Sequence, residues 1–379
     1  MDEGICYQVN LQESFGGGEI YTRFLSAALR KLGWRTVLFV NPRAAFWHGL
    51  GLEGATIVPV RTLTEIETRL AGERPLVVTH STLAPEEAAR FARRSVLTGL
   101  IHMPLYERFP EGLPHYRLLF GVSEHVIASA RSRGLSNVHE QPLYGVADLT
   151  PRGKLSRGGI HRASPYDSDR RKFRDRLLGA VAPLTSWMAP QRTYAKNAGL
   201  TLGIVSRLTP IKQFPLMFGM LAPLIARFPQ VSLEIFGSGG YASVRDFRRA
   251  LAPMRGQVRF WGQQDDVAAI YPQLDYVLSG LPEKEALGLN LIEAQCCGTP
   301  VLAVHAPPFT ETVAEGATGW FFEDPRRDRG ASFGALLERI LAGARRPQPG
   351  LAVEHLARFS EKAFVAAVAQ ALQAALASG

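Results

Sequence analysis

The sequence predicts an α/β protein with two doubly wound domains, and three observations support this prediction. Short apolar runs alternate with amphipathic stretches from Ile5 to about residue 150. A second series of the same kind begins at Leu200. Between the two series, residues 151–199 are basic and interrupt the alternation. Alternating short strands and helices are typical of parallel sheets with right-handed crossovers, so we expect one such sheet in each series.

The first series contains the runs expected of one doubly wound domain. The predicted strands are Ile5–Val9, Thr36–Val40, Thr56–Val60, Leu76–His80, Val96–Ile101 and Leu118–Val122. The predicted helices are Ile20–Leu32, Leu63–Ala71, Pro85–Arg94 and Glu124–Arg133. Doubly wound domains bind ligands beyond the carboxyl ends of their strands, so residues that follow these strands are candidates for a site.

Glycines and histidines follow some of these strands. Gly16 and Gly17 lie in a glycine-rich stretch between the first strand and the first helix, where the backbone can approach a ligand closely. A tight turn is the alternative explanation of these glycines. His80 and His102 stand at two further strand ends. A histidine at such a position is often a hydrogen-bonded structural residue, and this alternative applies above all to His80.

In the second series, charged residues and a glycine follow the predicted strands, as glycines and histidines do in the first series. Its predicted strands are Leu202–Val205, Val231–Phe236, Val258–Gly262, Tyr276–Leu278 and Val301–Val304. Arg207 and Lys212 flank the loop after the first of these strands, where a guanidinium fork and a flexible ammonium can together neutralise a diphosphate. Gly237 follows the second strand, where the backbone can pass close to a nucleotide.

Two carboxylates flank the start of a predicted helix, Leu289–Cys297, which Gly298 ends. Glu285 lies in the loop before this helix and Glu293 lies inside it. A helix N-terminus offers unpaired N–H groups that suit a phosphate, so both carboxylates could bind hydroxyl groups on either side of a diphosphate. Alternatively, Glu285 complements the helix dipole and Glu293 pairs with a neighbouring base.

The same residues resemble a known family signature. Glu-Ala-Leu-Gly-Leu-Asn-Leu-Ile-Glu-Ala, followed three residues later by Gly-Thr-Pro-Val, resembles the Glu-x7-Glu signature of the retaining GT-B glycosyltransferases of the family-four group. Ala286 and Leu287 replace the Gly and Phe that are common in that family. The resemblance is strong over residues 202–322, moderate before Asp148 and absent in residues 151–199.

The resemblance implies a fold and a set of site residues. It implies Rossmann-like domains over residues 1–150 and 200–354 that face each other across a cleft, a basic linker or insertion over 151–199, and a final helix, about 355–379, that packs on the first domain. The implied catalytic residues are Glu285, His102, Arg207 and Lys212. The implied donor-binding residues are Gly16, Gly17, Arg207, Lys212, Gly237, Gly288, Leu289, Asn290 and Glu293.

The resemblance also assigns a role to the most informative of these residues. Glu285 would bind hydroxyl groups of the donor sugar, Glu293 would bind the ribose, and His102 would steady the transferred sugar. Gly16 and Gly17 would lie near the phosphates or the acceptor. We expect no metal and no other cofactor, because Arg207, Lys212 and the helix start would stabilise the leaving diphosphate.

We therefore expect a retaining glycosyltransferase that moves a sugar from a nucleotide-diphosphate donor to a hydroxyl group. The expected acceptor is a glycan, a lipid-linked molecule or a lipopolysaccharide-type molecule. A nucleotide-sugar epimerase or a glycan phosphorylase on the same architecture is the alternative enzyme. A non-catalytic nucleotide-sugar-binding regulatory subunit is the alternative outside enzymes, although intact Arg207, Lys212, Glu285 and Glu293 argue against it.

The charge distribution suggests a further partner. Residues 151–199 contain eleven basic and three acidic residues, so this segment carries +8 of the formal net charge of +9. A solvated linker, with a helix over about Asp169–Leu178, is one interpretation. Contact with an anionic membrane surface or an anionic acceptor is the other. No nucleic-acid-binding motif accompanies the charge, so we expect no nucleic-acid partner.

Composition suggests where the protein acts. Cys6, Cys296 and Cys297 show no metal-ligand spacing and fit a reduced, cytoplasmic protein. No apolar run approaches the ~20 residues of a membrane span, and the first residues do not resemble a signal peptide. We expect a cytoplasmic protein, with peripheral contact at the inner membrane face as a further hypothesis.

Overall fold

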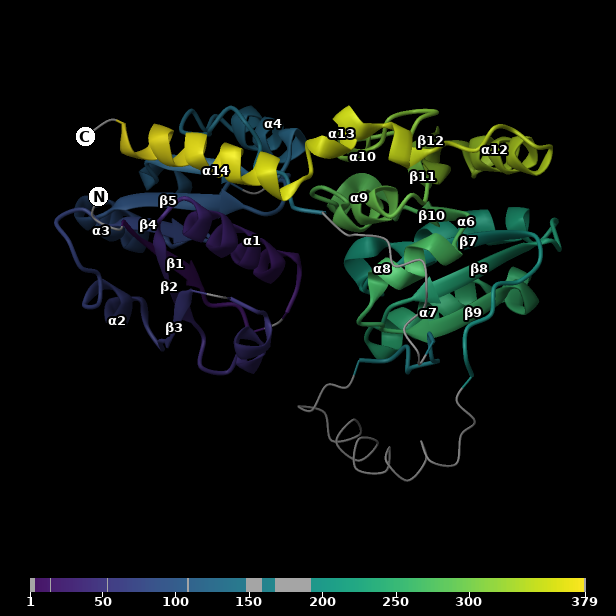
Figure 1. The fold of residues 1–379 in the computed structure, drawn as a ribbon, viewed down its shortest axis with the longest axis horizontal. Helices are drawn as coiled ribbons and strands as arrows, with labels where there is room; N and C mark the ends of the chain where they lie inside the picture. The colour runs from purple at the N-terminus through teal and green to yellow at the C-terminus, as the bar shows by residue number, and fades with distance from the viewer. Residues whose placement is uncertain are drawn as a thin grey trace, which may run out of the picture. The chain divides into compact units, whose positions relative to one another are not determined.

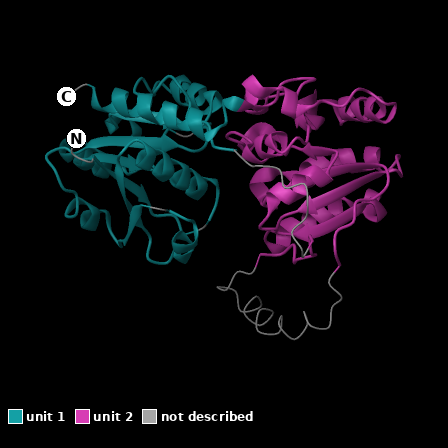
Figure 2. Ribbon diagram, viewed as in Figure 1, with its two compact units in different colours: residues 1–148, 357–379 teal, residues 149–356 magenta. Residues whose placement is uncertain are grey.

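A computed structural model describes residues 4–377 except residues 14, 53, 108, 148–158 and 168–191. The chain divides into two compact units (Figure 2). Unit 1 comprises residues 1–148 and 357–379, and unit 2 comprises residues 149–356. Each unit contains a six-stranded sheet against which helices pack (Figure 1).

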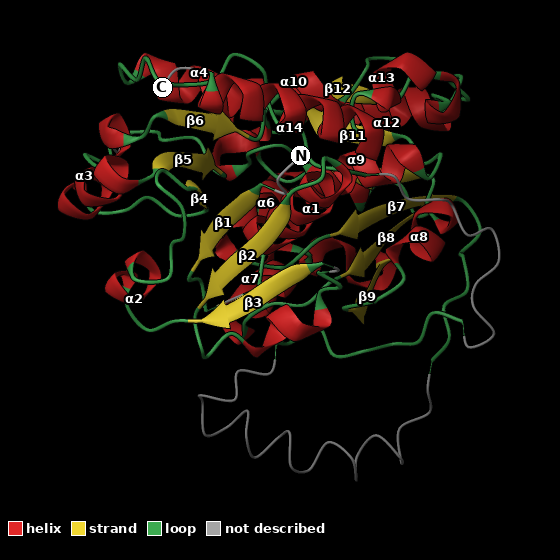
Figure 3. Ribbon diagram, turned by 60° about the vertical axis from the view of Figure 1, so that its left-hand side comes forward, coloured by secondary structure: helices red, strands yellow, loops and turns green. Residues whose placement is uncertain are grey.

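The sheet of unit 1 is parallel throughout and has the strand order β3-β2-β1-β4-β5-β6. Its strands are β1 (Ile5–Asn10), β2 (Arg35–Val40), β3 (Ala55–Pro59), β4 (Leu76–Thr79), β5 (Val96–Ile101) and β6 (Leu118–Gly121). Figure 3 shows β1, β2 and β3 side by side. The direction of winding changes between β1 and β4, which is the point where doubly wound folds bind ligands.

The helices of unit 1 include one from the far end of the chain. They are α1 (Gly17–Lys31), α2 (Leu63–Glu67), α3 (Pro85–Arg94), α4 (Glu124–Ser132) and α14 (Glu361–Leu376), with short 3-10 turns η1 (Ala45–Gly49) and η2 (Leu113–His115). Helix α14 buries Phe364 and Val368, and its first residue, Glu361, forms an ion pair of 2.6 Å with Lys31 of α1. The C-terminal helix is therefore part of unit 1.

Unit 2 repeats the topology of unit 1. Its strands are β7 (Leu200–Val205), β8 (Val231–Phe236), β9 (Val258–Gly262), β10 (Tyr276–Leu278), β11 (Val301–Val304) and β12 (Gly319–Phe322). All pairs are parallel, in the order β12-β11-β10-β7-β8-β9. Every residue of β8, β10 and β11 is buried, as expected for parallel strands covered on both faces. The change of winding lies between β7 and β10.

The helices of unit 2 are mostly short. They are α6 (Phe214–Ile225), α7 (Tyr241–Ala250), α8 (Val267–Ile270), α9 (Leu289–Cys296), α10 (Phe309–Thr312), α11 (Pro325–Asp328), α12 (Ala331–Leu341) and α13 (Val353–Ala357). The 3-10 turns are η3 (Pro210–Lys212), η4 (Ala252–Gln257), η5 (Tyr271–Gln273), η6 (Pro282–Lys284) and η7 (Pro349–Leu351). Gly298, with a φ of +80°, follows the end of α9, so the predicted helix stop is confirmed.

The described parts of the basic segment, residues 159–167 and 192–199, belong to unit 2. His161 and Thr193 form an antiparallel bridge, and Tyr166 forms a parallel bridge with Gly239. The side chains of Ile160 and Tyr194 are buried in the core of the unit. These residues therefore extend unit 2 beside β9. The predicted helix over about Asp169–Leu178 lies outside the described residues.

Three helices illustrate how the predicted elements differ from the structure. Helix α1 begins at Gly17 rather than Ile20, because the extended Gly16 already serves as its N-cap. Helix α2 ends at Glu67 rather than Ala71, since the chain turns at Thr68. Helix α7 was not predicted, because its buried apolar face consists of only two residues among arginines. Within the described residues, no helix combines the length and the apolarity that crossing a membrane requires.

Candidate functional site

Two loops meet where the winding of unit 2 changes. Strands β7 and β10 are parallel neighbours, so the loops that follow them leave the same edge of the sheet. Lys212 comes from the first loop and Glu285 from the second, and the Lys212 ammonium forms an ion pair with the Glu285 carboxylate. Their side chains are only 24% and 14% exposed. This limited contact with water makes the pair stronger than an ordinary surface ion pair.

Glu285 also contacts the start of α9. The N–H of Gly288 donates a 3.3 Å hydrogen bond to Glu285 Oε1. Gly288 is the N-cap of α9 with a φ of +79°, and a Cβ there would lie 3.0 Å from the Phe309 ring, so glycine is required. The Asn290 amide donates a 3.1 Å hydrogen bond to the carbonyl of Val205, the last residue of β7. The structure thus brings together Lys212, Glu285 and the first turn of α9.

This geometry agrees with the simpler interpretation of Glu285. A carboxylate at a helix N-terminus is stabilised by the helix dipole. In addition, Glu285 neutralises Lys212, which lies 73 residues away in the sequence. Any anion that binds Lys212 in this site must compete with this carboxylate.

Glu293 lies on α9 and is half-buried. Tyr271 O–H donates a 2.9 Å hydrogen bond to Glu293 Oε2. Desolvation raises the pKa of Glu293 to about 7, and the hydrogen bond from Tyr271 opposes this rise. Among the residues that the structure describes, the partner of Glu293 is the Tyr271 hydroxyl rather than a base.

Arg207 and Gly237 occupy the positions that the sequence predicted. Arg207 is exposed in the loop after β7, and Gly237 directly follows β8. Gly237 has a φ of +146°, and a Cβ there would clash with the carbonyl of Ser206. Its N–H donates a 2.7 Å hydrogen bond to the carbonyl of Gly262. The close backbone approach at Gly237 is therefore used within unit 2, and its contact with a nucleotide stays a prediction.

A second polar cluster lies where the winding of unit 1 changes. Gln8 belongs to β1, while His80 and His102 directly follow β4 and β5. His80 Nε2 lies 2.9 Å from Gln8 Oε1, and His80 Nδ1 lies 3.1 Å from His102 Nε2. The two imidazole rings stack with centroids 5.3 Å apart. His80 is therefore the buried, hydrogen-bonded residue that the structural interpretation describes, and it contacts His102 directly.

A backbone carbonyl fixes the direction of these hydrogen bonds. The Ser26 hydroxyl donates to the carbonyl of Thr22, so its oxygen accepts a hydrogen bond from Gln8 Nε2. Gln8 then presents Oε1 to His80, which donates from Nε2 and keeps Nδ1 as an acceptor. His102 donates its Nε2–H to that acceptor, so the proton of His102 is on Nε2.

Both histidines are neutral at pH 7. Burial lowers the pKa of His102 to about 4. Burial, and secondarily the neighbouring His102, hold the pKa of His80 well below its usual value of 6.5. A neutral pair can keep the donor and acceptor pattern described above, whereas protonation of either ring would disrupt it.

The glycine-rich stretch adjoins this cluster through the start of α1. Gly16 is the N-cap of α1, and a Cβ at Gly17 would meet only open space. A Cβ at Gly18 would lie 3.8 Å from the His102 ring. The structure therefore places Gly18 beside His102, whereas it shows no steric reason for glycine at Gly17.

Sequence reasoning missed four buried polar residues around these histidines. They are Gln8, Asn10, Glu19 and Thr22, each at most 4% exposed. Asn10 donates to Thr22 Oγ1 at 3.0 Å and to Glu19 Oε1 at 3.4 Å. Amides inside an otherwise apolar strand are an available signal, because buried polar residues are rarer than exposed apolar ones.

The structure does not decide the prediction of a metal-free site. No group of three or more His, Cys, Asp or Glu residues is placed to hold a metal ion in the described ranges. The sequence does contain one Asp-x-Asp spacing, Asp167 and Asp169, a pattern that can share a divalent cation. Asp167 donates its backbone N–H to the carbonyl of Gly239, and Asp169 lies outside the described residues.

The two repeated doubly wound sheets define the GT-B class of glycosyltransferase folds. The structure of Anabaena HepE in complex with UDP has a TM-score of 0.70 and 17% identity, covering 98% of this chain and 99% of that chain. A glycosyltransferase from Rickettsia africae has a TM-score of 0.72 and 14% identity, with full coverage of both chains. The predicted α/β fold with two Rossmann-like domains is confirmed.

Sequence comparisons also find glycosyltransferases among the proteins similar to this chain. Residues 190–349, which include the unit 2 site, match the family model of glycosyl transferases group 1. Phosphatidyl-myo-inositol mannosyltransferase of Mycolicibacterium smegmatis is 33% identical over 29% of this chain and 28% of its own length. D-inositol 3-phosphate glycosyltransferase of Rhodococcus opacus is 33% identical over 40% of this chain and 38% of its own length. The chain thus spans roughly a third of the length of these relatives.

Proposed function

We propose that this protein transfers a sugar from a nucleotide-diphosphate donor to a hydroxyl acceptor, with retention of configuration. One observation carries the proposal: Lys212, Glu285 and the start of α9 meet where the winding of unit 2 changes. Nucleotides bind at this point in doubly wound folds. The family match over residues 190–349 supports the activity, and HepE complexes with UDP and with UDP-glucose support the donor class.

In this proposal the diphosphate binds between Lys212 and the first turn of α9. The N–H groups near Gly288, Leu289 and Asn290 would donate to phosphate oxygens. The exposed Arg207 would supply a second cation from the same loop as Lys212. Because these groups are held in place before the reaction, they would stabilise the charge that develops on the leaving diphosphate without a metal or another cofactor.

The ion pair between Lys212 and Glu285 would exist only while no diphosphate is bound. When the diphosphate takes Lys212, the Glu285 carboxylate loses its cation and becomes available to hydroxyl groups of the donor sugar. Charge-assisted hydrogen bonds of this kind are about twice as strong as neutral ones. Glu293 would bind the ribose in its ionised form, so we expect donor affinity to rise as the pH increases through about 7.

We propose roles for the neutral cluster of unit 1 and its glycine-rich stretch as well. His102 would steady the transferred sugar, and Gly16 and Gly17 would lie near the phosphates or the acceptor. The departing phosphate would help to remove the proton of the acceptor hydroxyl. The low pKa of His102 keeps it neutral, so it can hydrogen-bond to a sugar without adding a charge.

The acceptor class is inferred from the names of similar proteins and from the basic charge of residues 151–199. One relative's name specifies phosphatidyl-myo-inositol, and one solved structure of the same fold is a lipopolysaccharide outer core galactosyltransferase. We infer a glycan, lipid-linked or lipopolysaccharide-type acceptor, met in the cytoplasm or at the inner membrane face.

Two measurements test the proposal. Nucleotide sugars should be screened for a rise in the midpoint of thermal unfolding, because a ligand that binds only the native state stabilises it. With the donor found in this way, Glu285→Ala should lower transfer by about a thousandfold, while Glu338→Ala, an exposed carboxylate on α12, should leave transfer unchanged. The proposal fails if no nucleotide sugar raises the midpoint, or if Glu285→Ala transfers sugar at the wild-type rate.

A further inference from the structure

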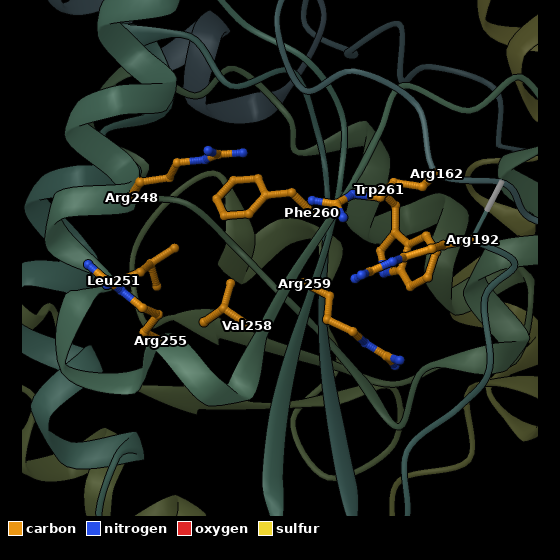
Figure 4. A pocket seen from close by; sticks show the side chains of 9 residues that line it. All are labelled: Arg162, Arg192, Arg248, Leu251, Arg255, Val258, Arg259, Phe260 and Trp261. Carbon is orange, nitrogen blue, oxygen red and sulfur yellow. The ribbon is translucent and has the colours of Figure 1, made fainter. Parts of the chain in front are cut away.

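A pocket of about 500 Å³ lies at the outer edge of the unit 2 sheet (Figure 4). It is built on the edge strand β9, two strands away from β7 and the proposed donor site. Nine of the residues that the structure describes line it, and among these nine, five are arginines and none is acidic. The pocket is therefore strongly cationic and separate from the residues that form the donor site.

One of the five arginines is already neutralised. Arg259 donates to both carboxylate oxygens of Glu234, with distances between 2.6 and 2.9 Å. Trp261 Nε1 donates to the same carboxylate at 2.7 Å. Glu234 therefore holds both Arg259 and Trp261 in place and neutralises the charge of Arg259.

The other four arginines have no acidic partner among the described residues; they are Arg162, Arg192, Arg248 and Arg255. In Figure 4, Arg162 and Arg192 extend from one side toward Phe260 and Trp261, Arg248 extends from the other side, and Arg255 points away. The Arg248 guanidinium lies 4.9 Å from the centre of the Phe260 ring. The backbone N–H of Arg162 donates a 2.9 Å hydrogen bond to the backbone carbonyl of Arg192, which keeps these two residues side by side.

Such a cluster favours the binding of an anion. The four side chains are exposed, so water screens much of the repulsion between their like charges, and part of it remains because they surround one pocket. A bound anion would remove this repulsion. The arrangement is therefore complementary to a ligand with more than one negative charge.

We propose that this pocket binds a phosphate group of a ligand other than the sugar donor. Guanidinium groups match phosphate oxygens through paired hydrogen bonds, and a phosphate monoester carries between one and two negative charges at pH 7. Three converging guanidinium groups suit such an anion better than a single carboxylate. The volume leaves room for the group that carries the phosphate. That group is either a soluble phosphate ester or a phospholipid headgroup, and the two share this chemistry.

The test uses the full chain with Arg207→Gln and Lys212→Gln, so that the proposed donor site no longer binds phosphate. In this background, inorganic pyrophosphate is titrated by calorimetry into a pocket variant, R162Q/R192Q/R248Q. The matched control is R227Q/R327Q/R345Q, which removes the same charge from exposed positions of unit 2 outside the pocket. We expect affinity to fall about a hundredfold in the pocket variant and less than about twofold in the control. Equal affinity in both variants would overturn the proposal.

A second arm identifies the source of the phosphate. Vesicles of phosphatidic acid, whose headgroup is a phosphate monoester, and of phosphatidylcholine are sedimented with the same proteins. Binding to phosphatidic acid alone that is lost in the pocket variant supports a headgroup, whereas pyrophosphate binding without vesicle binding supports a soluble ester. Should the pocket variant fail to fold by circular dichroism, Arg192→Gln replaces it, with an expected loss of about tenfold. Absence of pocket-dependent binding to either probe would contradict the inference.

Discussion

The two units share one topology and place a polar cluster at the same point, yet the clusters have different chemistry. In unit 1 the cluster around His80 and His102 is neutral and consists of directed hydrogen bonds. In unit 2 the cluster around Lys212 and Glu285 is ionic and bound to a helix start. The comparison teaches that the strand order sets where a ligand can bind, while the residues at that edge decide which chemistry occurs there.

The difference extends to how each cluster responds to a ligand. The neutral chain of unit 1 ends on a backbone carbonyl, so its donors and acceptors are fixed before any ligand arrives. The ion pair of unit 2 can be replaced by a new ion pair with an anionic ligand. We therefore propose that unit 1 positions a ligand and that unit 2 stabilises charge.

Loss of a fixed hydrogen bond should have a smaller effect than loss of Glu285. His80→Leu removes the acceptor of the His102 Nε2–H, so His102 loses its fixed tautomer and orientation. We expect kcat to fall by about tenfold to a hundredfold, with a smaller change in the donor KM. His115→Leu, an exposed position in η2, is the control. A purely structural His80 would instead lower the unfolding midpoint and leave kcat and its pH profile unchanged.

Glu293 should make unit 2 less stable as the pH rises. Its pKa in the folded chain is raised from 4.5 to about 7, so its stabilising contribution is complete below pH 4.5 and is lost as the pH rises through about 7. Glu293→Gln removes this loss, so relative to the wild type its free energy of unfolding should be higher by about 3 kcal/mol more at pH 8 than at pH 4.5. Urea denaturation at both pH values measures it, with Glu338→Gln as the control. An equal effect at both pH values would show that Glu293 does not titrate in this range.

The histidines of unit 1 should show the opposite pH dependence. The pKa of His102 is lowered from 6.5 to about 4, so the stability it contributes is present above pH 6.5 and is lost as the pH falls toward 4. His102→Gln should remove about 2 kcal/mol of that loss at pH 5. The same denaturation experiment at pH 5 and pH 8 measures it. If the stability of His102→Gln depended on pH as that of the wild type does, His102 would not cause the loss at low pH, and the predicted difference between the two units would be wrong.

The sequence predicted elements better than contacts. Strand β5 and helix α3 were predicted with their observed ends, because apolar runs and a proline at the helix start are local signals. The stop of α9 was predicted for the same reason. Helix α7 was missed, since its arginines hide a narrow apolar face.

The site was predicted as separate motifs, and only the fold explains how they combine. The contact between Lys212 and Glu285 depends on β7 and β10 being neighbours, which is a property of the sheet and not of either motif. The role of His80 in orienting His102 depends likewise on the adjacency of β4 and β5. Gln8 was overlooked because its partners lie on other elements and give no local pattern.

The central claim is that an anionic diphosphate competes with Glu285 for Lys212. The most direct measurement is the affinity of UDP and of GDP, which lack the donor sugar, for the wild type, Lys212→Gln and Glu285→Gln by calorimetry. The account predicts opposite changes for the nucleotide that binds: about tenfold weaker binding in Lys212→Gln and about threefold tighter binding in Glu285→Gln. Weaker binding in Glu285→Gln, or unchanged binding in Lys212→Gln, would contradict it.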